Sequence, residues 1–245
     1  MPDARRDQFE DATITRKWIA APGRLLIFTS FVLLISIFLW IGLVAQRNTS
    51  RRQHFERLGG QVTTVPASPV WLHDLVSKTI GNNGAAWLTH MSSVSFQDVP
   101  VADSELGALS TLTDSEIKNL ERLNLENTRV TDASLPFLRN LTSLKRLVLE
   151  NTKVSDSGLQ YLSGLTSLEG LNLESTQVTD AGLHHLSGLI NVRDLSLNGT
   201  QVTDEGLAHL TGLTNLQHLD LRNTKVTDAG IEGLRSRLPG IKVLH

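Results

Sequence analysis

The sequence contains no cysteine, which excludes disulfide bonds, thiol catalysis and thiolate metal sites. Aromatic residues make up only 5% of the chain, as expected where leucines supply most of the packing. The formal net charge of −2 gives neither a general basic field for nucleic acid nor an acidic tail. The chain also lacks the G-x-S-x-G, H-E-x-x-H, G-x-G-x-x-G and phosphate-loop patterns. We therefore predict no enzyme, no cofactor, no metal site and no nucleic-acid partner.

The C-terminal half instead holds five copies of one 24-residue pattern, L-T-x-L-x-x-L-x-L-x-x-T-x-V-T-D-x-G-L-x-x-L-x-G. The copies begin at Ile117, Leu141, Leu165, Leu189 and Leu213. A fixed period of about 20 to 29 residues built on L-x-x-L-x-L is typical of leucine-rich repeats. The pattern predicts an α/β fold: a right-handed leucine-rich-repeat solenoid with parallel strands on its concave face and short helices on its convex face.

The copy over residues 165–188 shows what each part of a repeat is expected to do. Its strand leucines point into the core because alternate side chains of a strand share one face. They are Leu168, Leu171 and Leu173. Thr176 is expected to hydrogen-bond the turning backbone. Thr179 and Asp180 offer oxygen acceptors at the start of the helix, which favours a role as N-caps.

Two sets of potential metal ligands have simpler explanations. The aspartates at 132, 156, 180, 204 and 228 lie one per repeat, whereas calcium needs about six to eight oxygens at one point. We interpret them as helix caps. His185 and His209 share a repeat position, but two ligands without a third make a weak zinc site. We expect these histidines to be exposed on the convex face.

The strand residues that point away from the core should form a separate surface. Their side chains stack in columns about 4.8 Å apart, and they change from copy to copy while the framework stays constant. Such variation on a constant frame favours a partner-reading surface over a merely solvated one. The candidate partner-binding residues are Arg122, Glu126, Arg146, Glu150, Asn172, Glu174, Asp194, Asn198, His218, Asp220 and Arg222.

The N-terminal part is organised differently. Residues 25–45 carry no charge and would span about 30 Å as a helix, the thickness of a bilayer's hydrocarbon core. We predict one transmembrane anchor there, after a cytoplasmic tail at 1–24; a cleaved signal peptide is the alternative. Residues 46–87 should form a linker helix and an N-terminal cap, with helical spacing over 70–80. Residues 88–236 hold one degenerate and five regular repeats, and 237–245 a C-terminal cap strand.

Together these residues resemble a bacterial family of short membrane-anchored leucine-rich-repeat proteins with V-T-D-x-G-L repeats. The resemblance covers 51–245 and includes R-R-Q…L-G-G at 51–60, P-V-W-L at 69–72 and the ending L-P-G-I-K-V. The repeats are also similar to the cysteine-containing type of leucine-rich repeat, with threonine where those often carry cysteine. The resemblance implies the fold, and a function only as protein binding.

The expected function is that of a membrane-anchored interaction module whose concave face binds a protein or envelope component. The expected location is the inner membrane, single-pass, with the repeats in the periplasm. The positive charges on the two sides of residues 25–45 are nearly balanced, so a reversed topology, with the repeats acting as a cytoplasmic adaptor or scaffold, is an alternative. A self-associating structural envelope protein is another.

Overall fold

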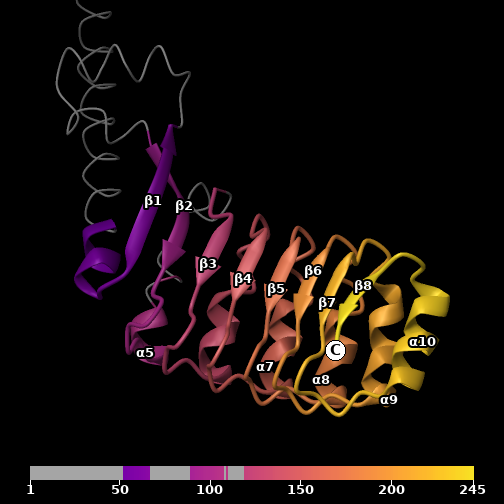
Figure 1. Cartoon of the computed structure of the whole chain (residues 1–245). Helices are drawn as coiled ribbons and strands as arrows, with labels where there is room; N and C mark the ends of the chain where they lie inside the picture. Colours follow the sequence, from indigo (N-terminus) through magenta and orange to yellow (C-terminus); the bar gives the residue numbers. More distant parts are fainter. Residues whose placement is uncertain (1–51, 67–88, 108, 110–118) are drawn as a thin grey trace, which may run out of the picture. The chain divides into compact units, whose positions relative to one another are not determined.

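The computed structural model describes residues 52–66, 89–107, 109 and 119–245 (Figure 1). All of them belong to one compact unit, Arg51–His245. The expected tail at 1–24, membrane anchor at 25–45 and helix at 70–80 lie outside the described residues. Within the described part of the chain, no helix is both long and apolar enough to cross a membrane.

Eight strands form one sheet whose spatial order follows the sequence. Strand β1 is antiparallel to β2, and every later pair of neighbours is parallel. The predicted α/β fold with parallel strands is thus confirmed. The strands are β1 (Gln61–Pro66), β2 (Thr89–Ser95), β3 (Arg122–Asn124), β4 (Arg146–Val148), β5 (Gly170–Asn172), β6 (Asp194–Ser196), β7 (His218–Asp220) and β8 (Lys242–Leu244).

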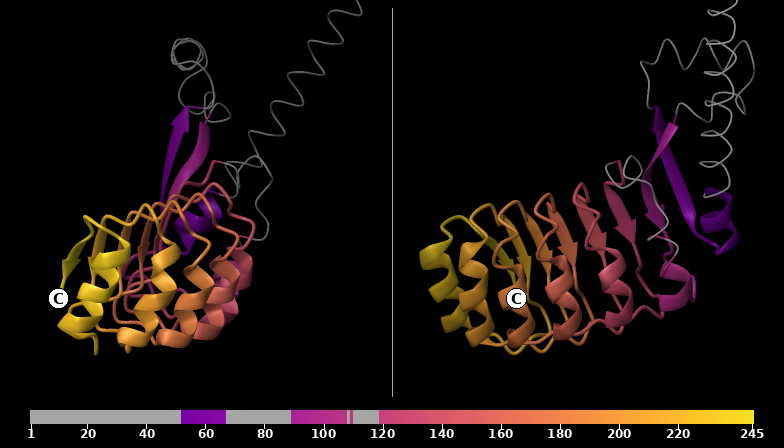
Figure 2. Two further views of the ribbon diagram at one scale, coloured as in Figure 1. Left: turned by 90° about the vertical axis from the view of Figure 1, so that its right-hand side faces the viewer. Right: turned by 180° about the vertical axis from the view of Figure 1, so that it is seen from behind.

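Short helices line the side of the stack opposite the strands (Figures 1 and 2). Most are a single α-helical turn that runs on into a 3₁₀ turn. The helices are α5 (Asp103–Leu106), η3 (Asp132–Phe137), α7 (Asp156–Leu159), η4 (Gln160–Leu162), α8 (Asp180–Leu183), η5 (His184–Leu186), α9 (Asp204–Leu207), η6 (Ala208–Gly212) and α10 (Asp228–Arg237).

The leucines between strands and helices form one continuous core. In the copy over 165–188, all three strand leucines are at most 2% exposed, as the pattern predicts. The threonine that follows them, Thr176, is buried, and its hydroxyl donates a 2.6 Å hydrogen bond to the carbonyl of Leu173. A buried hydroxyl needs such a partner, and the same bond recurs at Thr128, Thr152 and Thr200.

The start of the stack is covered by elements that are not repeats. Residues 52–57 form a helix, and the turn that ends it contains Gly59, where φ is +87°. Two backbone bonds close it, from Gly60 N–H to Phe55 C=O and from Gly59 N–H to Glu56 C=O, each 3.0 Å long. The buried Phe55 ring packs edge-on against Phe96, with centroids 6.0 Å apart. These contacts cover the apolar side of the first repeat.

The degenerate repeat that follows β1 packs as the ladder positions predict. Its described apolar ladder residues are buried: Met91, Val94, Phe96, Val101, Leu106 and Leu109. Its first strand, β2, pairs on one side with β3 and on the other with β1. The antiparallel pairing of β1 with β2 is not part of the repeat pattern.

The repeating aspartates do not act as the expected helix caps. The capping acceptor is the preceding threonine: the hydroxyl of Thr179 accepts the N–H of Ala181 at 3.3 Å. Asp180 is the first residue of α8, and its carboxylate reaches the next repeat, where it accepts the N–H of Thr203 at 2.8 Å and its hydroxyl at 2.7 Å. Four of the five aspartates, Asp132, Asp156, Asp180 and Asp204, bond the next repeat in this way, and in none of the five does the aspartate supply the helix cap, so the capping prediction was wrong for them.

Candidate functional site

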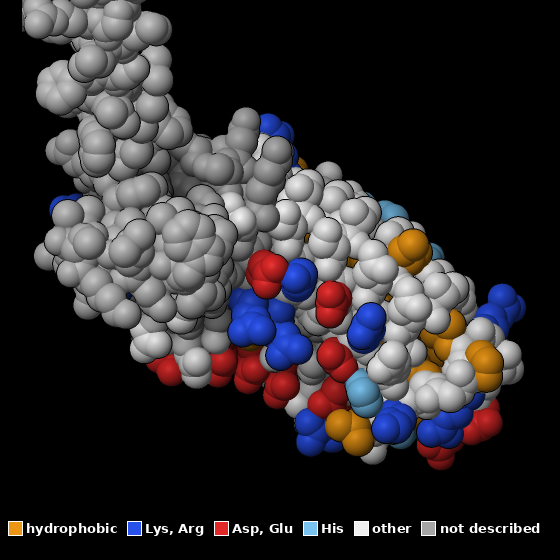
Figure 3. Space-filling model, turned by 90° about the horizontal axis from the view of Figure 1, so that it is seen from above, with side chains coloured by type: hydrophobic (Ala, Val, Ile, Leu, Met, Phe, Trp, Pro, Cys, Tyr) orange, Lys and Arg blue, Asp and Glu red, His pale blue; other side chains and the backbone are white. Residues whose placement is uncertain are grey.

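The first and third residues of strands β3 to β8 point away from the core and form what we call the strand face. Residues one repeat apart pair directly across the sheet, so they stack in columns as predicted. The first column consists of the first residue of each strand, and each member pairs with the next: Arg122, Arg146, Gly170, Asp194, His218 and Lys242. In Figure 3, basic and acidic side chains lie next to one another along the stack.

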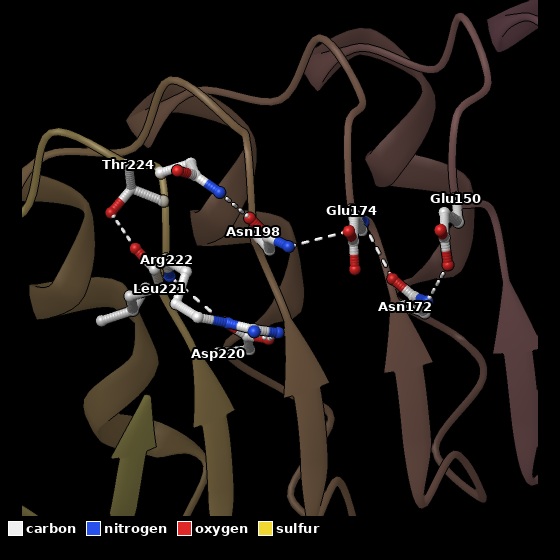
Figure 4. Close-up of polar contacts among 9 residues, drawn as sticks. Glu150, Asn172, Glu174, Asn198, Asp220, Leu221, Arg222 and Thr224 are labelled. Atoms are coloured by element: carbon white, nitrogen blue, oxygen red, sulfur yellow. Dashed lines mark hydrogen bonds and ion pairs between the residues drawn. The ribbon is translucent and has the colours of Figure 1, made fainter. Parts of the chain in front are cut away.

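The second column consists of the third residue of each strand, and its asparagines and Asp220 bond to the residues that follow the strands. The amide of Asn172 donates to Glu150 at 2.9 Å, and its carbonyl oxygen accepts the backbone N–H of Glu174 at 2.9 Å (Figure 4). Asn198 donates in turn to Glu174 at 2.7 Å. The asparagines thus bridge successive repeats and hold the glutamates in fixed positions.

The glutamates of this ladder repel one another. Desolvation raises the pKa of Glu126, and the charges of Glu150 and Asp98 raise it further. Desolvation also raises the pKa of Glu174, with Glu150 and Asp220 as additional causes. The stacked glutamates thus weaken the ionised state of two members of their column.

The two aspartates of the last strands, Asp194 and Asp220, each contact a basic side chain. Asp194 and His218 approach to 2.8 Å across β6 and β7. Asp220 receives the guanidinium of Arg222 at 2.6 Å, and this bond lowers the pKa of Asp220 despite the opposing effect of burial. Asp220 therefore has a cationic partner in Arg222, and Asp194 has a hydrogen-bond partner in His218.

A hollow of about 470 Å³ lies on the strand face over β4 to β8. Its floor contains backbone and apolar atoms as well as the hydroxyl of Ser196, which is buried and makes no hydrogen bond. Gly170 opens the hollow because it has no side chain, and the Arg146 side chain lies beside it. Such a concavity with an apolar floor and a few polar groups is suited to hold part of a partner.

Five of the predicted binding residues line the hollow: Arg146, Asn172, Asp194, His218 and Asp220. The other six, Arg122, Glu126, Glu150, Glu174, Asn198 and Arg222, are not among its lining residues. The prediction omitted Val148, Gly170, Ser196, Lys242 and Leu244, which do line it. The small size of Gly170 and Ser196 was the available signal, because a depression forms where side chains are short.

A further column, missed by the sequence analysis, forms the turn after each strand. Residues here adopt positive φ, a conformation that glycine, asparagine and aspartate tolerate best. They are Asp98, Asn127, Asn151, Ser175, Gly199 and Asn223. Asn151 donates to Asn127 at 2.7 Å, and Asn127 donates to Asp98 at 2.6 Å. The N, S or G that precedes each turn threonine was the sequence signal for this column.

His184, His185 and His209 lie on the helix side, and His218 is the one described histidine that lines the hollow. The rings of His184 and His185 are 3.7 Å apart, and His209 lies 6.2 Å from His184. Desolvation lowers the pKa of His185, and the neighbouring His184 lowers it further. Among the residues that the structure describes, no group of three or more histidines or carboxylates is placed to hold a metal ion.

A match to a protein-family model agrees with this architecture. Residues 118–161 and 190–236 match the model for leucine-rich repeats (two copies), so the chain contains leucine-rich repeats. No match was found among curated proteins. Among solved structures, an internalin from Listeria monocytogenes is 27% identical, with 58% of this chain and 43% of the internalin covered and a TM-score of 0.46. An internalin C2 from the same organism is 25% identical, with 74% and 84% covered and a TM-score of 0.49. This chain thus spans less than half of the first of these proteins.

Proposed function

We propose that this protein is a membrane-anchored interaction module that binds a protein or envelope component through its strand face. Leucine-rich-repeat domains typically mediate protein–protein interactions through such a surface. The observation that carries the proposal is the hollow of about 470 Å³ over β4 to β8. It lies where the residues vary between copies, while the buried framework repeats.

Filling the hollow tests this proposal. Gly170→Phe places a ring in it, and the space is available because a Cβ atom at this position meets only the flexible Arg146 side chain, at 3.4 Å or more. The tagged full chain is used to capture its partner from its own cells. We expect the amount of captured partner to fall at least about tenfold in this variant, because residues at the centre of an interface contribute most of its binding energy. Gly188→Phe is the matched control, because its added Cβ meets nothing within 4 Å and it does not line the hollow. Equal capture by both variants would refute the site.

The membrane anchor at 25–45 and a periplasmic location for the repeats are part of the same proposal. They rest on the uncharged run and on its fit to the thickness of a bilayer. The absence of cysteine allows a clean topology test, and Thr214 is a suitable label site because it is exposed, unlike the buried hydroxyl of Ser196. A membrane-impermeant maleimide that reaches Thr214→Cys in spheroplasts supports this orientation. Labelling only after lysis would indicate the opposite orientation, with the repeats in the cytoplasm acting as a scaffold.

A further inference from the structure

The strand face carries an arrangement of charge that the fold itself does not need. Arg122 and Arg146 are directly paired neighbours on β3 and β4, about 4.8 Å apart in the sheet. Both side chains are exposed, and neither guanidinium forms an ion pair or hydrogen bond with the described residues. Like charges opposite each other on adjacent strands destabilise a sheet. Two arginines paired across the sheet without a carboxylate partner are therefore a cost that a bound anion would remove, and the Arg146 guanidinium lies near Gly170 on the next strand.

The carboxylates closest in sequence do not neutralise this pair. Glu121 precedes Arg122, but its carboxylate is bonded to Lys145 at 2.7 Å. Within the hollow, Asp194 is paired with His218 and Asp220 with Arg222. At the other end of the hollow, Lys242 is exposed and has no acidic partner among the described residues. Arg122, Arg146 and Lys242 are therefore the positive charges of the strand face that have no acidic partner among the described residues.

The surroundings of the arginine pair restrict the kind of anion that fits. Arg146 lies at the edge of the hollow, beside Gly170, and Val148 and Leu171 line the same hollow. If a partner places an acidic side chain on the arginines, an apolar residue next to it in the partner would lie over the hollow. Further along the strands, Glu126 and Glu150 would repel a long polyanion, so a short acidic segment suits the surface better than nucleic acid.

We infer that the strand face binds an acidic peptide segment of its protein partner, with a carboxylate on Arg122 and Arg146 and an adjacent apolar side chain in the hollow. A planar guanidinium binds a carboxylate through two parallel N–H···O bonds, which fixes the direction of the segment as well as its affinity. The inference rests on the proposed function, because it names the chemistry of the partner that the same surface binds.

A random 12-residue peptide library selected on the purified full chain tests the inference. We expect the selected peptides to be rich in aspartate or glutamate with an apolar residue close by. Their affinity should fall at least about tenfold in the double variant Arg122→Gln/Arg146→Gln, because bonds to charged groups are among the strongest. The control is Arg129→Gln/Arg139→Gln, which removes the same charge from two exposed arginines outside the hollow.

Two further readings separate the inference from the proposed function. The double variant should unfold at an equal or higher temperature than the wild type, since it removes a repulsive pair; a structural role for the arginines predicts the opposite. The selected peptides could lack acidic residues, bind the double variant normally and still lose binding to Gly170→Phe. That outcome would overturn the inference and leave the proposed function standing. Peptides insensitive to Gly170→Phe would count against both. A library that yields no enriched peptide, or a preference for single-stranded DNA over the acidic peptides, would also overturn the inference.

Discussion

The carboxylate of Asp180 accepts two hydrogen bonds from Thr203, a residue 23 positions later in the chain: one from its N–H at 2.8 Å and one from its hydroxyl at 2.7 Å. The same pair of bonds joins Asp156 to Thr179 and Asp204 to Thr227. A solenoid depends on contacts between neighbouring repeats, since no repeat covers its own ends. These aspartates supply a polar contact of that kind on the helix side of the core.

Replacing Asp180 by Ala should therefore destabilise the stack. The change leaves the Thr203 N–H and hydroxyl without their acceptor, and such a loss costs about 1–3 kcal/mol. The measurement is the urea midpoint of the full chain. Asp228→Ala is the matched control, because the Asp228 side chain is 98% exposed and no described repeat follows it. If both variants shift the midpoint equally, the contribution of the inter-repeat bond is refuted.

This aspartate also shows where reading the sequence reaches its limit. The V-T-D signature correctly predicts the start of each helix, because a hydroxyl before an apolar run is a local signal. The partner of the aspartate is 23 residues away, so only the spatial stacking of repeats reveals it. The strand leucines were predictable for the opposite reason: their burial follows from alternation within a single strand.

Truncating Leu171 to Ala should cost about 2–5 kcal/mol, as in other well-packed cores. Leu171 is only 2% exposed, and its strand neighbour Leu173 is fully buried. The prediction is checked by urea unfolding, with Leu244→Ala as the control, since Leu244 is 56% exposed. A midpoint for Leu171→Ala that matches the wild type would contradict the assignment of this leucine to the core.

The column of glutamates should make the protein more stable as the pH falls from neutral. Desolvation and like charges raise the pKa values of Glu126 and Glu174 above their ordinary 4.5. The folded state then binds protons more readily than the unfolded chain, so the free energy of unfolding rises as the pH drops through the folded pKa values towards 4.5. Below an ordinary aspartate pKa of 3.8 the trend should reverse, because hydrogen bonds from Thr227 lower the pKa of Asp204 in the folded state.

Replacing Glu150 by Gln isolates this effect. Glu150 raises the pKa of both neighbours, whereas glutamine keeps an oxygen that can accept from Asn172. We expect stabilisation of about 0.2–1 kcal/mol at pH 7, the usual range for cross-strand pairs, and a weaker pH dependence between pH 7 and about pH 5. Urea midpoints at the two pH values measure both. Glu205→Gln on the helix side is the control, and an unchanged pH dependence in Glu150→Gln would refute the coupling.

The candidate site was only partly predictable. The columns of the strand face follow from the period of the repeat, since equal spacing places equivalent residues side by side. The hollow does not, because it depends on which neighbouring side chains are short and on how the long ones lie. Gly170 and Ser196 were each visible as members of a column, but their effect appears only when Arg146 is seen lying beside Gly170.

A glycine stands two residues after four of the five repeating aspartates, and it gives the last prediction because it lies against the aspartate of the preceding repeat. A Cβ atom on Gly182 would lie 2.4 Å from the Asp156 carboxylate oxygen and 3.0 Å from Leu159. Gly182→Ala should thus destabilise the chain by about 1–3 kcal/mol, although alanine normally favours a helix by about 0.5–1 kcal/mol. Gly188→Ala, with open space around it, should be close to neutral.

A double-mutant cycle identifies the cause of that cost. In an Asp156→Ala background the carboxylate is gone, so Gly182→Ala should cost clearly less than in the wild type. The two residues contact each other directly, so the effects of the two substitutions on the free energy of unfolding should not be additive. Strict additivity in urea unfolding would mean that the glycine is required for another reason, such as its contact with Leu159. Non-additivity would show that the D-x-G spacing exists because the aspartate of one repeat occupies the space left by the glycine of the next.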